Sequence, residues 1–131
     1  MPAFSETGRK RLEQCDVRLQ RVFNEVIKHF DCSVLCGHRG EAEQNEAFRS
    51  GTSTQRWPAS KHNTLPSKAV DVAPYPIQWD DVERFRYFSG FVMGIASQLG
   101  IKLRWGGDWD GDTDLKDQNL IDLPHFEVVD A

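Results

Sequence analysis

The chain has 131 residues, a length typical of one domain, and its 16 basic and 20 acidic residues give a formal net charge of −4. No basic run marks it as a nucleic-acid binder, so we expect no nucleic-acid partner. No stretch approaches the roughly 20 apolar residues of a membrane span, and neither a repeat nor a linker divides the chain. We therefore predict a single domain over residues 1–131 that is monomeric and does not insert into a membrane.

The cysteines and the N-terminal residues bear on where the protein is made. Cys15, Cys32 and Cys36 are odd in number, whereas a secreted disulfide framework normally leaves no cysteine unpaired. The first residues also lack the apolar core of a secretory signal peptide. We expect synthesis in a reducing cytoplasm and no export by the signal-peptide route.

The first half of the chain predicts two helices, one strand and a long loop. Apolar residues recur at intervals of three and four from Arg9 to Phe30, which predicts one amphipathic helix. The apolar run at 32–36 predicts a buried strand, and a polar helix should follow at 41–49. Residues 51–68 are rich in Gly, Ser, Thr and Pro and predict a long loop, which in a compact domain is often functional.

The second half predicts a second amphipathic helix among short strands. Asp80 and Glu83 resemble a capping box at the start of a helix that continues to Gly100. The other predicted elements are strands at 69–73, 101–105 and 125–129, with an acidic loop at 106–122. The sum is an α+β domain with a small sheet and flanking helices.

Three side chains in this second half and the long loop suggest a metal site. Asp71 lies within the apolar run Ala-Val-Asp-Val-Ala, where burial of a carboxylate is costly unless it is paired or binds a cation. His62 lies in the long loop, and strand alternation would point His125 to the same side as Glu127. Two imidazoles and one carboxylate are a common zinc set that leaves a fourth position for water. Zinc lowers the pKa of that water toward ~7 and polarises a carbonyl, which suits amide hydrolysis.

A catalytic zinc also needs a general base and a group that stabilises the oxyanion. Asp122, three residues before His125, could face the metal without binding it, although a turn aspartate before proline explains the spacing equally well. Arg39 is a candidate oxyanion stabiliser, or simply a solvated arginine. His38 is a rival metal ligand, and His29, inside the first predicted helix, is a weaker rival.

Five segments of residues 34–129 carry a family resemblance. In order, they are Gly37-His-Arg-Gly40 followed by Gln44-Asn45, Ser60-Lys-His62, Ala69-Val-Asp-Val-Ala-Pro74, Ile101-Lys-Leu-Arg-Trp-Gly-Gly-Asp-Trp109, and Asp122-Leu-Pro-His125. Together they resemble the zinc D-alanyl-D-alanine carboxypeptidase and dipeptidase superfamily, and especially its small phage endolysins that act as L-alanyl-D-glutamate peptidases.

The resemblance implies a hedgehog/DD-peptidase-like fold with zinc as cofactor. The implied zinc ligands are His62, Asp71 and His125. It further implies that Asp122 is the catalytic acid/base and that Arg39 contacts the substrate carbonyl or carboxylate. It also implies that His38 is not a ligand.

The sequence departs from the family pattern at two places. The spacing from His62 to Asp71 is longer than in many members, through extra residues around Leu65-Pro66. Such an insertion is tolerable if both ends of the loop still reach the metal. The base is aspartate where many members have glutamate, although the endolysin branch also uses aspartate.

The acidic loop is a second candidate metal site. Four aspartates alternate along it as calcium ligands might: Asp108, Asp110, Asp112 and Asp114. Counted from the first of them, an EF-hand requires Gly at the sixth place and Glu at the twelfth, but Thr113 and Asn119 occur there. Some related endolysins use calcium in this region, so calcium binding and a solvated acidic loop both remain open.

The leading hypothesis is a zinc peptidase that cleaves a peptidoglycan stem peptide between L-alanine and D-glutamate during phage lysis. Without a signal peptide, it would wait in the cytoplasm until a holin opens the membrane. The nearest alternative is a carboxypeptidase that removes a terminal D-alanine with the same zinc machinery. In a non-catalytic alternative, the domain binds cell wall and Cys32 or Cys36 closes a structural zinc site. Cysteine–histidine catalysis has no support beyond the presence of both residue types.

Overall fold

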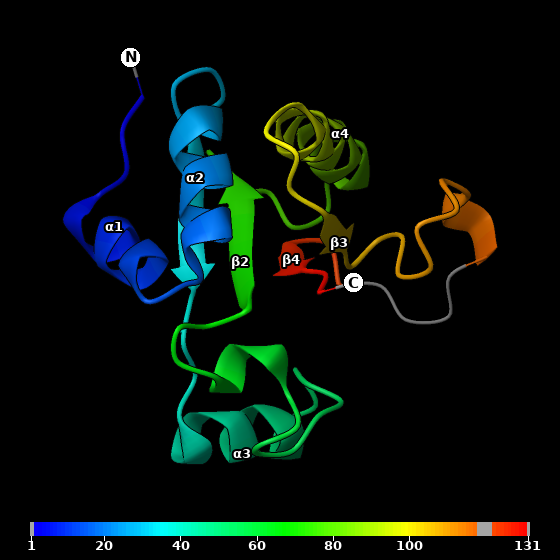
Figure 1. The fold of residues 1–131 in the computed structure, drawn as a ribbon. Helices are drawn as coiled ribbons and strands as arrows, with labels where there is room; N and C mark the ends of the chain where they lie inside the picture. Colours follow the sequence, from blue (N-terminus) through cyan, green and yellow to red (C-terminus); the bar gives the residue numbers. More distant parts are fainter. Residues whose placement is uncertain (1, 118–121, 131) are drawn as a thin grey trace.

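The computed structural model describes residues 2–117 and 122–130, which form helices around a small sheet (Figure 1). In chain order, the elements are α1 (Glu6–Glu13), α2 (Val17–Val26), β1 (Cys32–Cys36), α3 (Glu41–Arg49), the 3₁₀ helix η1 (Lys61–Asn63), β2 (Ala69–Pro74), α4 (Val82–Gln98), β3 (Leu103–Trp105), the 3₁₀ helix η2 (Leu115–Asp117) and β4 (His125–Val128). The predicted α+β class is confirmed. Among the described residues, no helix has the length and apolar character needed to cross a membrane.

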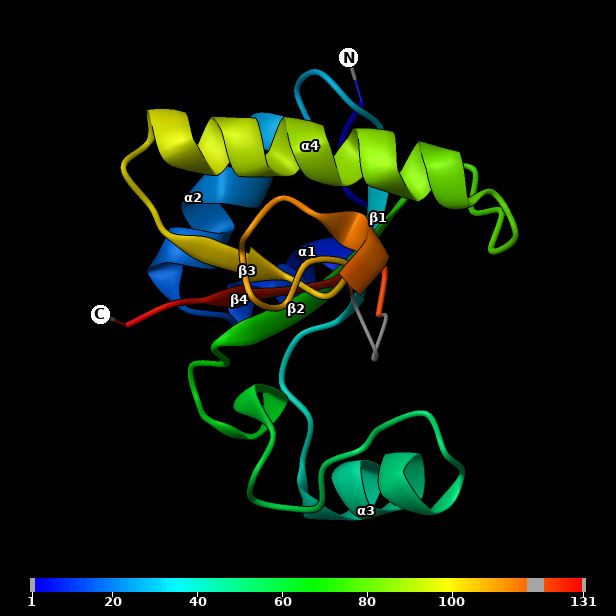
Figure 2. The same ribbon diagram turned by 90° about the vertical axis from the view of Figure 1, so that its right-hand side faces the viewer.

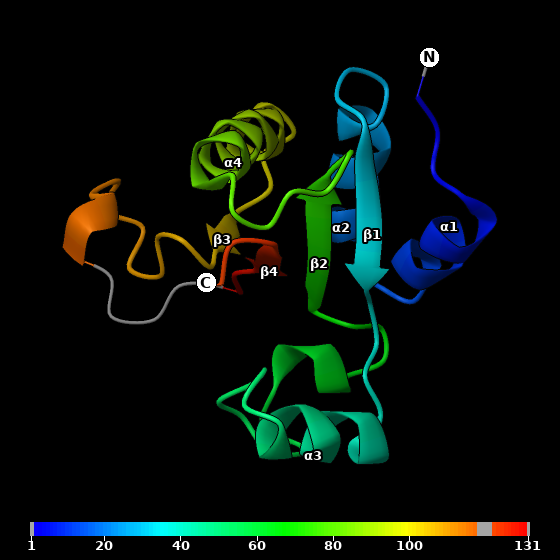
Figure 3. The same ribbon diagram turned by 180° about the vertical axis from the view of Figure 1, so that it is seen from behind.

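The four strands form one antiparallel sheet in the order β1-β2-β4-β3. β2 and β4 are therefore the central pair, with Asp71 directly opposite His125. β3 pairs with the other edge of β4 and places Arg104 opposite Glu127. Figure 3 shows β1 at the edge of the sheet away from β3, with α1 beside it.

Two helices cover one face of this sheet and form the core with it. The Phe126 ring of β4 lies 5.4 Å from that of Phe23 in α2 and 6.3 Å from that of Phe88 in α4. Because side chains alternate along a strand, Phe126 and Val128 enter the core while His125 and Glu127 point to the opposite face. In Figure 2, α3 and η1 lie on the opposite side of the strands from α4.

The prediction of one helix from Arg9 to Phe30 is wrong, because the chain forms two helices separated at residues 14–16. The Asp16 side chain accepts a hydrogen bond from the Arg18 amide at 2.9 Å and caps α2, a position that aspartate favours. The backbone at the break also pairs with Ser67, which donates to the Gln14 carbonyl and accepts from the Asp16 amide, each at 2.8 Å. A capping side chain and a distant partner thus interrupt a continuous apolar pattern.

The remaining elements follow the predictions with small shifts. The helix at 41–49 and the strand at 69–73 are confirmed, the strand extending one residue further to Pro74. The last helix begins at Val82 rather than near Asp80, because its cap is Asp81, whose carboxylate accepts from the Arg84 amide. Residues 51–68 form a long loop interrupted by η1, as predicted. The strands predicted at 101–105 and 125–129 span 103–105 and 125–128.

Candidate active site

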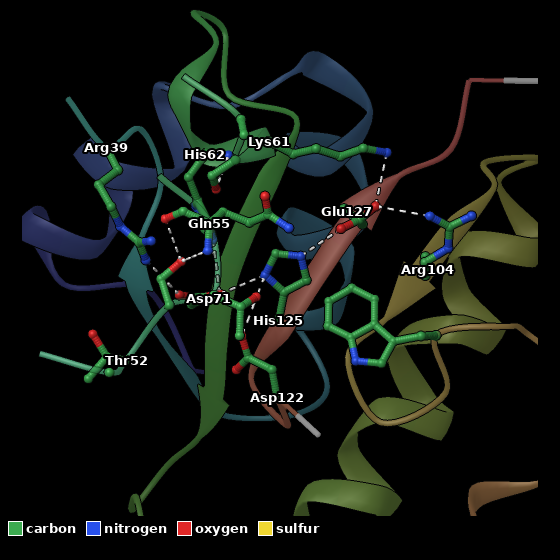
Figure 4. Close-up of a pocket in the computed structure, with 16 residues that line it drawn as sticks. Arg39, Thr52, Gln55, Lys61, His62, Asp71, Arg104, Asp122, His125 and Glu127 are labelled. Atoms are coloured by element: carbon green, nitrogen blue, oxygen red, sulfur yellow. Dashed lines mark hydrogen bonds and ion pairs between the residues drawn. The ribbon is translucent and has the colours of Figure 1, made fainter. Parts of the chain in front are cut away.

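A cavity of about 630 Å³ opens on the side of the sheet opposite its core (Figure 4). β2 contributes Asp71, β4 contributes His125 and Glu127, and η1 contributes Lys61 and His62. The fold thus brings His62, Asp71 and His125 into one cavity, although they lie up to 63 residues apart in sequence.

Two imidazoles converge on one oxygen of Asp71. Its register partner His125 places Nδ1 3.3 Å from Asp71 Oδ1. Ser60 caps η1 by accepting from the His62 amide, and this short helix carries His62 Nε2 to 3.3 Å from the same oxygen. The predicted trio is therefore assembled by strand register on one side and by a capped turn on the other.

Two buried polar atoms at this point lack a hydrogen bond. Among the described residues, no partner in hydrogen-bonding geometry reaches His62 Nε2 or Asp71 Oδ1. Leaving such atoms unsatisfied costs about 1–3 kcal/mol each. A divalent cation between them would remove that cost, and the donor set of two imidazoles and a carboxylate fits zinc.

The other nitrogen of each imidazole is already engaged. His62 Nδ1 lies 2.8 Å from the Gly37 carbonyl oxygen, and His125 Nε2 lies 2.8 Å from Glu127 Oε1. Each ring therefore donates its N–H away from Asp71 and presents its remaining nitrogen toward it, an orientation that metal-binding histidines require. This role of Glu127 was not predicted from the sequence, although its spacing of two residues from His125 places both side chains on one face of the strand.

The acidic side chains at the site favour a positive charge between them, as the pKa values of the three residues indicate. Burial opposes protonation of His62, but Asp71 and Cys36 outweigh it and raise its pKa to about 10. Burial also opposes protonation of His125, yet Asp71 and Glu127 raise its pKa. Burial alone would raise the pKa of Asp71, but the two histidines lower it well below its usual value. The carboxylates thus stabilise positive charge here, whether protons or a metal supply it.

Asp122 lies at the rim of this group. Its Oδ2 is 3.9 Å from His125 Nδ1, and its side chain is half-exposed to the cavity. Burial and the charge of Asp71 raise the pKa of Asp122. A carboxyl whose pKa moves toward neutrality and that faces the cavity is suited to proton transfer.

Arg39 also faces the cavity and is held in place rather than solvated. Its Nη2 lies 3.7 Å from Asp71 Oδ2, and its Nη1 donates to Gln44 Oε1 at 3.0 Å. Gln44 is fully buried and is itself fixed by donation to the Gln55 carbonyl and by the Asn63 amide. Gln44, from the Gln-Asn pair that follows the arginine motif, therefore holds Arg39 in place, whereas Asn45 accepts from the Trp57 amide at 3.3 Å.

Of the alternative metal ligands considered from the sequence, only Cys36 lies near the site in the described residues. His29 pairs with Glu25 at 3.3 Å, and neither His29 nor His38 lines the cavity or joins a group of possible metal ligands in residues 2–117 and 122–130. Cys32 is buried in the core. Cys36 is adjacent to the site, and its Sγ lies 3.9 Å from His62 Nδ1.

Possible ligand atoms form two overlapping groups that share Asp71. One group also contains Cys36 and His62, the other Asp122 and His125, and within each the ligand atoms lie within 4.8 Å of one another.

The acidic loop brings three of its four aspartates together. One oxygen each of Asp108, Asp110 and Asp112 lies within 4.8 Å of the others, and Asp114 is not part of this group. Thr113 has a φ of 67° and donates its amide to Asp108 Oδ2 at 3.0 Å. This is the conformation that glycine favours at the sixth place of an EF-hand. Asn119, at the twelfth place, lies outside the described residues.

The fold and the cavity together define a small α+β domain with a candidate active site on the open face of an antiparallel sheet. The sequence model of the phage L-alanyl-D-glutamate peptidases matches residues 2–129, and the chain belongs to that family. The resemblance noted in the sequence is thereby confirmed.

Individual relatives agree with this assignment over nearly their whole length. The L-alanyl-D-glutamate peptidase of Escherichia phage T5 is 32% identical over 135 residues, which cover 96% of this chain and 97% of the phage protein. The crystal structure of the Serratia marcescens L-Ala D-Glu endopeptidase ChiX superimposes with a TM-score of 0.74 at 26% identity, covering 98% of this chain and 91% of ChiX. The chain is thus similar to the phage T5 protein in sequence and to ChiX in both fold and sequence.

Proposed function

We propose that the protein is a zinc-dependent endopeptidase that hydrolyses the bond between L-alanine and D-glutamate in the stem peptide of peptidoglycan. Family membership supports the substrate, since the relatives carry that activity in their names. The single observation that carries the metal is the pair of buried, unbonded atoms, His62 Nε2 and Asp71 Oδ1, 3.3 Å apart. His62, Asp71 and His125 would hold the zinc.

The side chains around the proposed zinc site would then have separate chemical roles. When bound, zinc supplies a Lewis acid that polarises the scissile carbonyl and acidifies water. Asp122 accepts a proton from the attacking water at its carboxylate and passes it to the leaving amine of D-glutamate. Arg39 faces the developing oxyanion and stabilises its charge. The Gly37 carbonyl and Glu127 keep both imidazoles oriented throughout.

The position of Cys36 favours an open, catalytic site over a closed, structural one. Its sulfur approaches Nδ1 of His62, whereas the nitrogen that faces Asp71 is Nε2. One imidazole cannot present both nitrogens to the same ion. We therefore propose that Cys36, although it belongs with His62 and Asp71 to a group of possible ligands, does not bind this zinc, which leaves the fourth position for water and substrate.

The place and form of action are part of the same proposal. Action on the cell wall agrees with the family. We further propose that the protein works as a monomer and reaches the wall from the cytoplasm when a holin opens the membrane.

Digestion of defined muropeptides with and without a chelator tests the activity. Mass spectrometry should detect a product that begins with D-glutamate, formed only when zinc is present, whereas a carboxypeptidase would release D-alanine. Intact tetrapeptide and pentapeptide stems after incubation with zinc would exclude both activities. A matched pair of variants tests the ligands: His125→Ala should lose bound zinc, and His38→Ala, outside the cavity, should retain it.

A further inference from the structure

Two cations of the cavity share one oxygen of Glu127. Lys61 Nζ lies 2.9 Å and Arg104 Nη1 lies 3.4 Å from Glu127 Oε2, and Figure 4 shows both side chains reaching this carboxylate. Both side chains line the cavity, and they are 39% and 40% exposed, whereas that of Glu127 is only 8% exposed. The two cations therefore face the substrate space while their shared partner lies beneath them.

The charge at this point is not balanced. Glu127 supplies one negative charge, and its other oxygen already accepts from His125 Nε2. The two other acidic residues of the cavity lining, Asp71 and Asp122, lie near His125 instead. One carboxylate facing two cations leaves an excess positive charge at the cavity wall.

Both cations also retain unused donors. Within the described residues, Arg104 makes its side-chain contact through Nη1, although a guanidinium carries five N–H groups. Lys61 has three N–H donors and contacts two acceptors, Glu127 and, at 3.3 Å, the Val128 carbonyl oxygen. One cation would be enough to neutralise the charge of Glu127, and it would not need to be exposed to the cavity. A second anion could bridge the two side chains that are present.

The subsite lies beside the proposed reaction centre. Lys61 immediately precedes His62, and Glu127 is hydrogen-bonded to His125, so both cations adjoin proposed metal ligands. A substrate group that contacts them must therefore lie near the scissile bond. Glutamate has two carboxyl groups, and a peptide that continues through one of them leaves the other free and anionic.

We propose that Lys61 and Arg104 form a carboxylate-binding subsite that recognises the free carboxylate of the glutamyl residue following the scissile bond. The inference rests on the proposed function and names the feature of the substrate that this end of the cavity selects. Charged groups near the reacting bond contribute to selectivity because a site built for an anion discriminates against its neutral analogue.

The test compares two stem peptides that differ only in this carboxylate, which is free in one and converted to the amide in the other. For the full chain supplied with zinc, kcat/KM should be higher for the free carboxylate by roughly tenfold, the lower end for a hydrogen bond to a charged group. Lys61→Met and Arg104→Met should each reduce this ratio several-fold. Arg104→Lys should restore part of it.

Lys68→Met is the matched control. Lys68 is similarly exposed, at 43%, and in the described part of the chain it pairs with one carboxylate, that of Asp130, but it does not line the cavity. Its ratio should equal that of the wild type. Because both peptides are measured with the same preparation, misfolding or incomplete metal loading lowers both values equally and cancels in the ratio.

The outcomes separate this inference from the proposed function. Cleavage of both peptides by the wild type with equal efficiency, or an unchanged ratio in both methionine variants, overturns the subsite while the endopeptidase stands. Failure of the wild type to cleave either peptide overturns the endopeptidase and the subsite together.

Discussion

Asp71 and His125 are direct partners across the central antiparallel pair of the sheet, and their side chains meet on its open face, with 3.3 Å between Asp71 Oδ1 and His125 Nδ1. The Val72 amide donates to the Pro124 carbonyl at 2.9 Å and helps to fix this register. A slip of one residue would exchange the two faces of a strand. The same register that buries Val72 and Phe126 in the core therefore brings together two of the three proposed zinc ligands.

Asp122→Asn should abolish most of the activity without loss of zinc. Asparagine keeps the shape of the side chain but cannot accept a proton, so kcat/KM for a muropeptide should fall by roughly 10²–10⁴. Metal analysis should find zinc at the wild-type stoichiometry, because Asp122 is proposed as a base and not as a ligand. Asp80→Asn, at an exposed position before α4, is the control and should be fully active. Activity near that of the wild type in Asp122→Asn would remove the base assignment.

Glu127→Gln should weaken zinc binding before it affects the fold. The change leaves His125 without its charged acceptor, and such partners of metal-binding histidines are worth about 10–100-fold in affinity. Competition with a coloured chelator measures this loss directly. Glu127→Asp, which keeps the charge, should recover part of the affinity. Equal affinities for the wild type and Glu127→Gln would mean that the hydrogen bond does not orient the imidazole.

Zinc binding should release protons at neutral pH. In the metal-free protein the pKa of His62 is raised to about 10 and that of His125 is also raised, so zinc must displace protons that the folded chain holds. The affinity for zinc should therefore rise with pH at pH values below the pKa of His62, by about tenfold per pH unit for each proton released. Calorimetry in buffers of different ionisation enthalpy should give buffer-dependent heats. Identical heats in all buffers would contradict proton release.

Local patterns predicted which side chains gather at the candidate site better than they predicted the elements around it. A carboxylate in an apolar strand marked Asp71 without any knowledge of the fold. The break before α2 escaped because Leu12 and Leu19, seven residues apart, stay on one helical face, while the Ser67 contact that interrupts them is remote in sequence. The link from Glu127 to Lys61 escaped for the same reason, because it joins a strand to a loop turn far from it in the chain.

The acidic loop should bind calcium weakly. Asp108, Asp110 and Asp112 bring oxygens together, but the EF-hand pattern is incomplete, so we expect a dissociation constant of roughly 10⁻⁴–10⁻³ M. Calorimetric titration of calcium into zinc-loaded protein measures it. Thr113→Gly should tighten binding, because glycine adopts the positive φ of this position without strain. Absence of heat in both proteins would leave the loop as a solvated acidic segment.

Gly106→Ala should damage catalysis through the backbone that carries Asp122. Gly106 accepts from the Asp122 amide at 2.8 Å and donates to the His125 carbonyl at 2.9 Å, so it lies between the proposed base and a proposed ligand. A methyl group at this position would overlap the Asp122 carbonyl oxygen, and rigid backbone cannot move aside cheaply. Such overpacking typically costs about 1–3 kcal/mol, measurable by urea unfolding, and it should also lower kcat/KM.

The matched control for this change is Gly94→Ala on the exposed side of α4. A methyl group there meets no atom within 4 Å, and alanine should stabilise the helix by about 0.5–1 kcal/mol. The two substitutions add the same group, so only the local environment separates them. If Gly106→Ala kept the wild-type kcat/KM while losing stability, the position of Asp122 would not depend on this close approach, and its placement beside His125 would have to come from the strand alone.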